Sequence, residues 1–460
     1  MTSSTNQATV TKDSLANLID LFTEWSLNWI PDSMVFVILL TLIVFAMAWG
    51  FTDHGPFQLI LDYTKGFWAL LTFAMQLCLL IITGFVIADS KPVHFLIVKL
   101  VDWPKTVNQT IVMYILVAGF VSWLHWGIGI MLGIVMGREI AVRKRGLGLH
   151  YPFLVGVIYS MGVLSNGPSQ AAQLLVATPG HVMEKVTGVI PLTQTTFSPH
   201  LLVTVLILYI GLPIIMLMVK PHQKDSVEIS DATAKEFSMV EVETDVESLR
   251  PAERLERSKL LLPIIALGIL VSVGNFIWLN GIGRLDLNTL NFAFLGLAML
   301  LHGSSHRFMA SVTKGVTATT GIIIQFPLYA GIFGMISNSG LAQIITDWFL
   351  SISTARTLPW IVFLYTGIID FFVPSAGSKF VIEAPYIIPA AQQLGVSVPQ
   401  ILNAYTQGSC WVNMLQPFWA LPVLGAMKVR FQDILPYTFI TWVWVLVVVS
   451  FMFLVWPNGF

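Results

Sequence analysis

The sequence has few charged residues and almost no cysteine. Only 11% of its 460 residues are Asp, Glu, Lys or Arg, whereas an ordinary soluble domain carries about 25%. The two cysteines, Cys78 and Cys410, lie far apart inside apolar runs, which argues against a disulfide framework or a cysteine-ligated metal site. The formal net charge of −1 provides no basic surface for nucleic acid. These shortages exclude a soluble disulfide-rich domain and a nucleic-acid-binding protein.

What the sequence does contain is a series of long apolar runs. No Asp, Glu, Lys or Arg occurs in the runs 34–50, 66–88, 110–137, 151–180, 260–283, 315–346 and 384–427. A helix that crosses a bilayer needs roughly 20 such residues. The sequence therefore predicts an all-α polytopic membrane protein.

The loops between these runs predict the orientation in the membrane. We expect spanning helices near 34–53, 110–137, 151–178, 199–219, 260–280, 287–301, 359–395, 400–427 and 436–456. We also expect an interfacial amphipathic helix near 15–30, within an N-terminal segment 1–33. With the N-terminus in the cytoplasm, 17 basic residues lie on the cytoplasmic side and 6 on the other, as the positive-inside rule requires.

A weak internal repeat divides the chain into two halves. At an offset of 249 residues Lys65 and Gly66 fall on Lys314 and Gly315; at 248, Gly129 falls on Gly377; at 247, Asn166 falls on Asn413. The predicted transmembrane repeats are 34–220 and 260–460, joined by a cytoplasmic linker, 221–259. The predicted spans orient the second repeat opposite to the first. Inverted repeats are typical of secondary transporters, in which each half supplies one of two alternating gates.

Several apolar runs are interrupted by residues that disturb a helix. The interruptions are Trp126-Gly127-Ile128-Gly129, Ser165-Asn166-Gly167-Pro168-Ser169, Pro374-Ser375-Ala376-Gly377 and the stretch from Gly408 to Pro417. Irregular backbone at membrane depth is tolerated where it is buried or lines a cavity. We also expect re-entrant hairpins over 66–90 and 315–350, the second because of Gln325, Pro327, Gly331 and Gly334. Discontinuous helices can present a positive N-terminal end to an anion and free carbonyls to a cation.

Three ionisable residues lie within the apolar zone. A charge near the bilayer centre costs about 2.5–3.5 kcal/mol on insertion scales and usually faces a pathway or another charge. Lys379 and Glu383 are four residues apart and share one helix face, and Asp370 precedes the break. Lys379 is predicted to pair with an anionic substrate, while an ion pair with Glu383 is the structural alternative. Asp370 is either a cation ligand or a residue near a helix end.

Several of these motifs resemble the bacterial short-chain fatty acid transporter family. The resemblance rests on Gly66-Phe67-Trp68, Trp126-Gly127-Ile128-Gly129, Gln325-Phe326-Pro327, Pro374-Ser375-Ala376-Gly377, Glu383-Ala384-Pro385 and, most specifically, the stretch from Asn413 to Pro422. It covers roughly residues 20 to 456. It implies uptake of short-chain fatty acids such as butyrate or acetoacetate. It also implies membership of the ion transporter superfamily, with two hairpins, elevator-like movement, coupling to a cation or proton, and often a homodimer in the bacterial inner membrane.

The sequence thus predicts a symporter of small monocarboxylates, with no enzymatic activity and no cofactor. The residues predicted to bind the substrate are Lys379, Ser375, Gly377, Ser378, Asn166, Ser169, Asn413, Gln325, Trp126, Gly127 and Gly129. Those predicted to serve coupling are Ser165, Asn166, Gly167, Asp370, Glu383 and Asn413. The coupling ion, either Na⁺ or H⁺, stays open, and sodium is the only metal considered. The alternatives are a carrier of dicarboxylates, amino acids or peptides, a passive channel, and an intramembrane enzyme, for which no catalytic motif is found.

Overall fold

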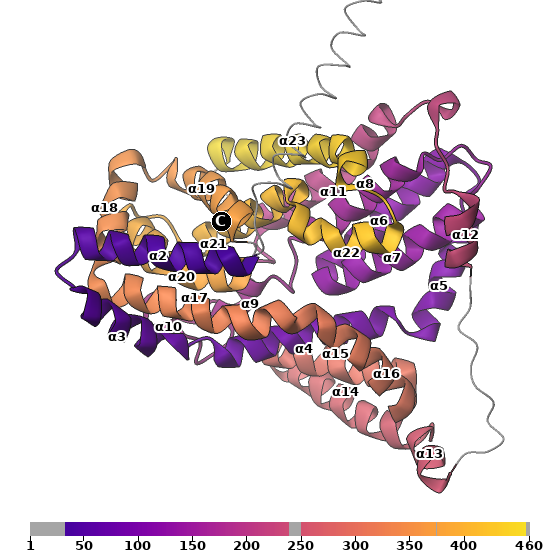
Figure 1. Ribbon diagram of the computed structural model, residues 1–460, viewed down its shortest axis with the longest axis horizontal. Coiled ribbons are helices and arrows are strands. Elements are labelled where there is room, and N and C mark those ends of the chain that lie inside the picture. Colours follow the sequence, from indigo (N-terminus) through magenta and orange to yellow (C-terminus); the bar gives the residue numbers. More distant parts are fainter. Residues whose placement is uncertain (1–32, 239–249, 374, 457–460) are drawn as a thin grey trace, which may run out of the picture.

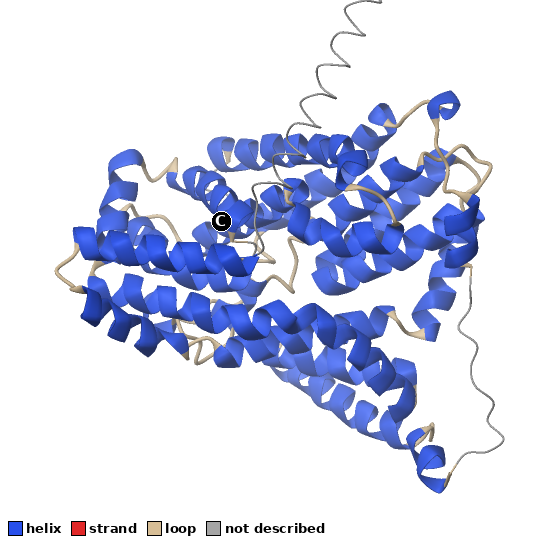
Figure 2. Cartoon of the chain, in the orientation of Figure 1, coloured by secondary structure: helices blue, strands red, loops and turns tan. Residues whose placement is uncertain are grey.

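The computed structural model describes residues 33–238, 250–373 and 375–456. Over these ranges the chain is helical and contains no β-strand (Figure 2). Seven of the described helices are long and apolar enough to cross a membrane. The polytopic all-α class is therefore confirmed, whereas the interfacial helix predicted near 15–30 and Pro374 fall outside the described residues.

The helices gather into two lobes, seen in the lower and upper parts of Figure 1. Lobe A contains α2 (Ser33–Phe51), α3 (Pro56–Phe67), α4 (Leu71–Ala88), α14 (Leu261–Asn280), α15 (Leu287–His302), α16 (Ser305–Val316) and α17 (Thr320–Ser339). Lobe B contains α6 (Val107–Leu124), α7 (Trp126–Arg143), α8 (Tyr151–Val163), α9 (Ala171–Ala177), α11 (Pro199–Val219), α19 (Leu358–Phe372), α20 (Ala376–Gln393), α21 (Val398–Val412), α22 (Pro417–Met427) and α23 (Phe431–Val455). The shorter helices are α5 (Lys91–Asp102), α10 (Glu184–Thr187), α12 (Asp231–Phe237), α13 (Pro251–Glu256) and α18 (Leu341–Ile352), with 3₁₀ turns η1 (Gln223–Asp225), η2 (Ile282–Arg284), η3 (Thr317–Thr319) and η4 (Asn413–Leu415).

Helix contacts occur in pairs that correspond under the offset of about 249 residues. This offset relates α3 to α16, α4 to α17, and α7 to α20. Helix α3 packs against α17, and α16 packs against α4; between the lobes, α4 packs against α7, and α17 against α20. Single residues follow the same exchange, since Gly66 lies against Gly334 and Gly315 lies against Phe85. Each of these contacts therefore has a counterpart between the equivalent helices or residues of the opposite half of the chain.

Glycine permits the close approach of α3 and α17. A Cβ atom on Gly66 would lie 2.4 Å from the Ala330 carbonyl oxygen, and one on Gly334 would lie 2.3 Å from the Asp62 carbonyl oxygen. Small residues let transmembrane helices bring their backbones together. The glycines that suggested a turn within 315–350 therefore serve helix packing instead.

The structure does not confirm hairpins over 66–90 and 315–350. In the first stretch a short turn at 68–70 is followed by α4, which is continuous from Leu71 to Ala88, and in the second α17 continues through Pro327. The chain turns only after α17, at Gly340, where a φ of +90° suits glycine. Helices α4 and α17 belong to lobe A, where continuous helices form the packing.

The chain does fold back inside a run predicted as one spanning helix, 110–137. His125 has extended backbone (φ −154°, ψ 110°), and its Nδ1 accepts hydrogen bonds from the backbone N–H groups of Gly127 and Ile128. A Cβ on Gly129 would meet Ser122, and one on Gly133 would meet Tyr114. Helices α6 and α7 are therefore an antiparallel hairpin, and the prediction of one helix was wrong because a histidine cap begins a new helix there.

A second fold-back replaces the predicted single helix over 359–395. Side chains of α19 and α20 pair with one another: Asp370 with Lys379, Thr366 with Glu383, and Tyr365 with Tyr386. The separation along the chain grows steadily from pair to pair, as it does in an antiparallel hairpin. The two repeat-matched breaks are thus the tips of two helical hairpins.

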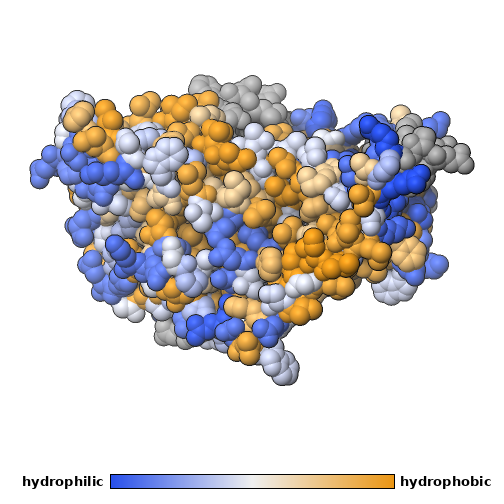
Figure 3. All heavy atoms as spheres, turned by 90° about the horizontal axis from the view of Figure 1, so that it is seen from below, coloured by the Kyte–Doolittle hydropathy of each residue, from blue (hydrophilic) through white to orange (hydrophobic). Residues whose placement is uncertain are grey.

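Polar loops gather at the two ends of the long axis. At one end Lys144 Nζ donates to the Pro104 carbonyl, Arg138 donates to the Ala426 carbonyl, and Lys428 pairs with Glu236. At the other end Arg356 donates to the Leu454 carbonyl and Gln392 to the Val186 carbonyl. Figure 3 shows patches of hydrophobic side chains across one face, with hydrophilic ones between them and more of the hydrophilic ones toward both ends. This distribution is the one expected of a protein that crosses a bilayer.

Candidate functional site

The hairpin tips meet the breaks of two other helices inside lobe B. One break separates α8 from α9 at 164–170, and the other separates α21 from α22 at 413–416. The backbone N–H of Trp126, at the first tip, donates to Ser169 Oγ at 3.0 Å. The Gln416 amide at the second break donates to the carbonyls of Asp370 and Phe371 at 3.1 and 2.9 Å. Four interruptions far apart in the sequence therefore form one region.

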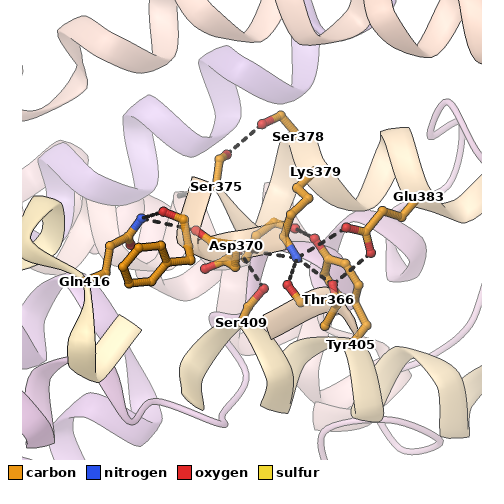
Figure 4. A network of polar contacts seen from close by, with 11 residues as sticks. Thr366, Asp370, Ser375, Ser378, Lys379, Glu383, Tyr405, Ser409 and Gln416 are labelled. Carbon is orange, nitrogen blue, oxygen red and sulfur yellow. Dashed lines mark hydrogen bonds and ion pairs between the residues drawn. The ribbon is translucent and has the colours of Figure 1, made fainter. Parts of the chain in front are cut away.

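A buried cluster of charges occupies the second hairpin (Figure 4). Lys379 Nζ lies 3.4 Å from Asp370 Oδ1 and 3.6 Å from Glu383 Oε1. It donates to the carbonyl and the hydroxyl of Thr366 at 3.0 and 2.5 Å, and it lies 4.3 Å from the centre of the Tyr405 ring. Of the alternatives drawn from the sequence, the structure favours the ion pair for Lys379 and enlarges it to three charged groups.

The cluster contains more negative than positive groups. Asp370, Lys379 and Glu383 are each at most 1% exposed. Two carboxylates then share one ammonium, and Asp370 Oδ2 and Glu383 Oε1 have no hydrogen-bond partner among the described atoms. Isolated buried charge is strongly unfavourable. The geometry therefore favours a further positive charge, and the ammonium already occupies the space between the carboxylates, which suits a proton better than a metal ion.

The two hairpin tips differ in how their second helices begin. The first turn of α7 is capped, because His125 accepts from two of its N–H groups and Ser169 accepts from a third. The cap residue of α20, Ser375, makes no side-chain cap hydrogen bond. Its hydroxyl instead accepts from Ser378 Oγ at 2.7 Å, apart from the network around Lys379 (Figure 4). An uncapped helix start attracts anions, so α20 is the better place for a carboxylate.

Unpaired amide groups surround the two breaks. Both amide atoms of Asn166 are buried without a hydrogen-bond partner among the described atoms, and so are Asn413 Oδ1, Gln407 Oε1 and Gln416 Oε1. Buried polar groups are normally paired. These amides are therefore candidate contacts for a polar ligand.

The structure brings together most of the predicted site residues. Ser165 accepts from the Gln170 amide, which also lies 3.5 Å from Cys410 Sγ. Cys410 follows Ser409, whose hydroxyl donates to Asp370 Oδ1 at 3.0 Å. The first break is thereby linked to the charge cluster.

The predicted glycines lie at close contacts rather than against open space. A Cβ on Gly167 would lie 1.7 Å from the Trp123 carbonyl oxygen, and one on Gly377 would lie 2.9 Å from the Phe73 ring. Gly127 and Gly129 face His125 and Ser122 within the first hairpin. Gln325 lies in α17 of lobe A, and none of the contacts described above includes it.

Several residues of the site were missed from the sequence. Thr366 and Tyr405 bind Lys379, and Tyr159 donates to the carbonyls of Asn413 and Gln416 at 2.5 and 2.9 Å. A usable signal existed for Thr366, which lies four residues before Asp370 and so shares its helix face. Tyr159 has no such signal in the sequence.

Comparison with known proteins gives concordant results. The family described as "Short chain fatty acid transporter" matches residues 15–456. A provisionally named short-chain fatty acid transporter of Escherichia coli is 35% identical over 90% of this chain and 94% of its own. A protein of Haemophilus influenzae with the same provisional name is 34% identical over 89% and 92%.

Two solved structures share the fold. The YdaH transporter of Alcanivorax borkumensis has a TM-score of 0.59 and 14% identity, covering 93% of this chain and 98% of that one. MtrF of Neisseria gonorrhoeae, described as illuminating a class of antimetabolite efflux pumps, has a TM-score of 0.59 and 15% identity, covering 95% and 97%. At this identity the likeness extends to the fold alone.

Proposed function

Because the chain belongs to the short-chain fatty acid transporter family, we propose that it is a proton-coupled symporter of small monocarboxylates such as butyrate or acetoacetate. The observation that carries the proposal is the buried cluster of two carboxylates and one ammonium beside the uncapped start of α20. Family membership makes the chain a transporter rather than an enzyme. The coupling ion, the substrate and the mechanism below are parts of the proposal.

The substrate carboxylate would lie at the first turn of α20. Ser375 and Ser378 supply hydroxyls there, and the N-terminal end of a helix favours negative charge. Lys379 belongs to the same turn and adds positive charge from inside the cluster. The amides of Asn166 and Asn413 at the two breaks would contact the rest of the ligand. The role predicted for Gln325 in α17 of lobe A stays a prediction.

Coupling follows from the charge balance of the cluster. A bound carboxylate adds a further negative charge near Asp370, Lys379 and Glu383. Proton binding to one of the two carboxylates then becomes more favourable, and by thermodynamic linkage a bound proton strengthens binding of the anion by the same factor. The substrate and the proton are therefore carried together.

The two lobes suggest how the site changes sides. Asp370, Lys379 and both breaks belong to lobe B, which meets lobe A where α4 packs against α7 and α17 packs against α20. We propose an elevator movement in which lobe B, with its site, slides against lobe A. The exchanged contacts support two inverted repeats, 34–220 and 260–460, with α6–α7 and α19–α20 as re-entrant hairpins in place of the stretches first predicted.

The hairpins also change the predicted sidedness of several loops. Residues 91–105 lie beside Arg143 and Lys144, so Lys91, Lys99 and Lys105 move to the cytoplasmic side, while Arg356 moves away from it. Basic residues then divide 19 against 4 instead of 17 against 6. This stronger positive-inside bias supports a cytoplasmic linker over 221–259. From the family likeness we also propose a bacterial inner membrane and a homodimer.

Uptake into proteoliposomes tests the proposal. Labelled acetoacetate and butyrate are offered with an imposed pH gradient or an imposed sodium gradient, and protein-free vesicles correct for passive diffusion of the neutral acids. We expect accumulation with the pH gradient alone. Accumulation driven by sodium alone would exclude proton coupling, and equilibration without accumulation under either gradient would favour a channel.

Two further measurements define the roles of the cluster and the substrate class. Glu383→Gln should abolish gradient-driven accumulation but keep exchange of labelled for unlabelled substrate, because only the proton step is lost. Glu253→Gln, in the exposed linker helix α13, is the matched control. Competition by unlabelled dicarboxylates, amino acids or peptides that exceeds competition by butyrate would favour the alternative substrates.

A further inference from the structure

A cavity lies at the end of the molecule that carries the linker, away from the charge cluster. It has a volume of 490 Å³ and opens between the start of α6, the start of α8 and the end of α11. Its lining includes Lys105, Asn108, His150 and Lys220. Neither the proposed transport cycle nor the comparisons assign anything to this cavity.

The cavity is positively charged. Lys105 and Lys220 line it, whereas no described side chain in its lining is a carboxylate. Two nearby acidic groups are engaged elsewhere, since Asp102 pairs with Arg143 at 3.5 Å and Glu228 accepts from the backbone N–H groups of Gly146 and Gly148. The first turn of α6 also lines the cavity, but Thr106 caps it by accepting from the Gln109 N–H, so the positive charge of the cavity comes from the lysines.

An exposed apolar stripe leads away from the cavity along two neighbouring helices. On α11, Ile210, Ile214 and Met218 are 55%, 58% and 79% exposed. Their spacing of four residues places them on one face, which ends just before Lys220. Helix α6 packs against α11 and exposes Leu116 and Phe120 at the same spacing. A cationic cavity at the end of a long exposed apolar stripe matches a molecule with an anionic head and hydrocarbon chains.

We propose that this cavity binds the phosphate headgroup of an anionic phospholipid, whose acyl chains lie along α6 and α11. Basic pockets between transmembrane helices at the cytoplasmic side are suited to such headgroups. Lys220 Nζ already contacts Asn108 Oδ1, so it is held at the cavity wall. Lys105 supplies the second charge. The apolar stripe selects a lipid over a free phosphate ion.

Lipid retention by the purified protein tests the assignment. The protein is exchanged into detergent with equal amounts of phosphatidylglycerol and phosphatidylcholine, and bound lipids are counted by native mass spectrometry. Wild type should retain phosphatidylglycerol selectively. The double variant Lys105→Gln/Lys220→Gln should bind it roughly 30-fold more weakly, at about 1 kcal/mol for each lysine. The control Lys235→Gln/Lys259→Gln removes two exposed lysines outside the cavity and should retain the lipid.

A second variant guards against loss of folding. Asn108→Asp preserves an acceptor for Lys220 but adds negative charge to the cavity, so it should also lower retention of phosphatidylglycerol. Equal retention by wild type and both cavity variants would overturn the proposal. Lysine-dependent binding of inorganic phosphate in the absence of selective lipid retention would overturn the lipid assignment in favour of a free anion. Because this readout needs no transport, it is independent of the proposed symport.

Discussion

Removing the ammonium from the buried cluster should destabilise the protein through the carboxylates that remain. Lys379 Nζ lies 3.4 Å from Asp370 and 3.6 Å from Glu383, and all three side chains are at most 1% exposed. Breaking a buried ion pair by deleting one partner costs about 3–5 kcal/mol. In Lys379→Met the long apolar side chain keeps most of the volume, so the expected loss comes mainly from unpaired charge.

The expected shift in melting temperature can be worked from that loss. At about 2 °C for each kcal/mol, the lower end of the range for large domains, Lys379→Met should melt roughly 6–10 °C below wild type in detergent. The triple variant Lys379→Met/Asp370→Asn/Glu383→Gln removes the two negative charges as well. It should recover at least half of the difference, because no ionised group then remains buried.

Thermal unfolding followed by intrinsic tryptophan fluorescence measures both variants under identical conditions. Size-exclusion chromatography before each scan checks that the starting material is monodisperse. A triple variant that melts no higher than Lys379→Met would refute the reasoning, since the loss would then come from packing or hydrogen bonding rather than charge. Wild-type stability of Lys379→Met would refute it as well.

Two further predictions concern helix packing and the linker. Gly66→Ala should lower the free energy of unfolding by about 1–3 kcal/mol, because the new Cβ would lie 2.4 Å from a backbone oxygen. The control Gly268→Ala, whose Cβ would have no atom within 4 Å, should leave the free energy of unfolding unchanged. Equal melting temperatures of the two variants would contradict this prediction. Burial lowers the pKa of His150, whose Nδ1 accepts a hydrogen bond from the Val227 N–H at 3.0 Å. The folded protein therefore favours the neutral imidazole. The stability that His150 contributes is present above its unfolded pKa and is lost as the pH falls toward the lower folded pKa. Acidification from about pH 7.5 to below the ordinary histidine pKa of about 6.5 should therefore lower the hydrogen-exchange protection factor of the Val227 amide, which is corrected for the intrinsic pH dependence of exchange, in wild type but not in His150→Asn. Identical pH profiles of the protection factor would exclude His150.

The sequence predicts the membrane class and the interrupted positions well, because both depend on local composition. Uncharged runs of about 20 residues leave few alternatives to helices in a bilayer. The breaks at 126–129, 165–169 and 374–377 were likewise visible as glycine, proline and serine within such runs. Family membership, inferred from motifs at these breaks, is confirmed by the comparisons.

The direction of the chain after each break was not predictable. Glycine and proline interrupt a helix whether the chain then continues or returns, and His125, which starts α7 by capping it, resembles an ordinary core histidine in sequence. Glycines in α17 suggested a turn, although their role is contact with α3, a partner more than 250 residues away along the chain. Only part of the charge cluster around Lys379 could be predicted from the sequence. The spacing of four residues places Glu383 beside Lys379 on one helix, whereas Asp370 contacts Lys379 from the other helix of the hairpin.

Under the elevator movement proposed above, the division into two lobes separates the residues that determine selectivity from those that determine the rate of transport. Every charged or amide group assigned to the ligand belongs to lobe B, whereas the buried side chains of α4 and α17, the helices of lobe A that meet it, are mostly apolar. Substitutions of those side chains can then alter turnover without touching the chemistry that chooses the cargo. Relatives in this family could thus adjust transport rate and cargo independently, each through its own set of positions.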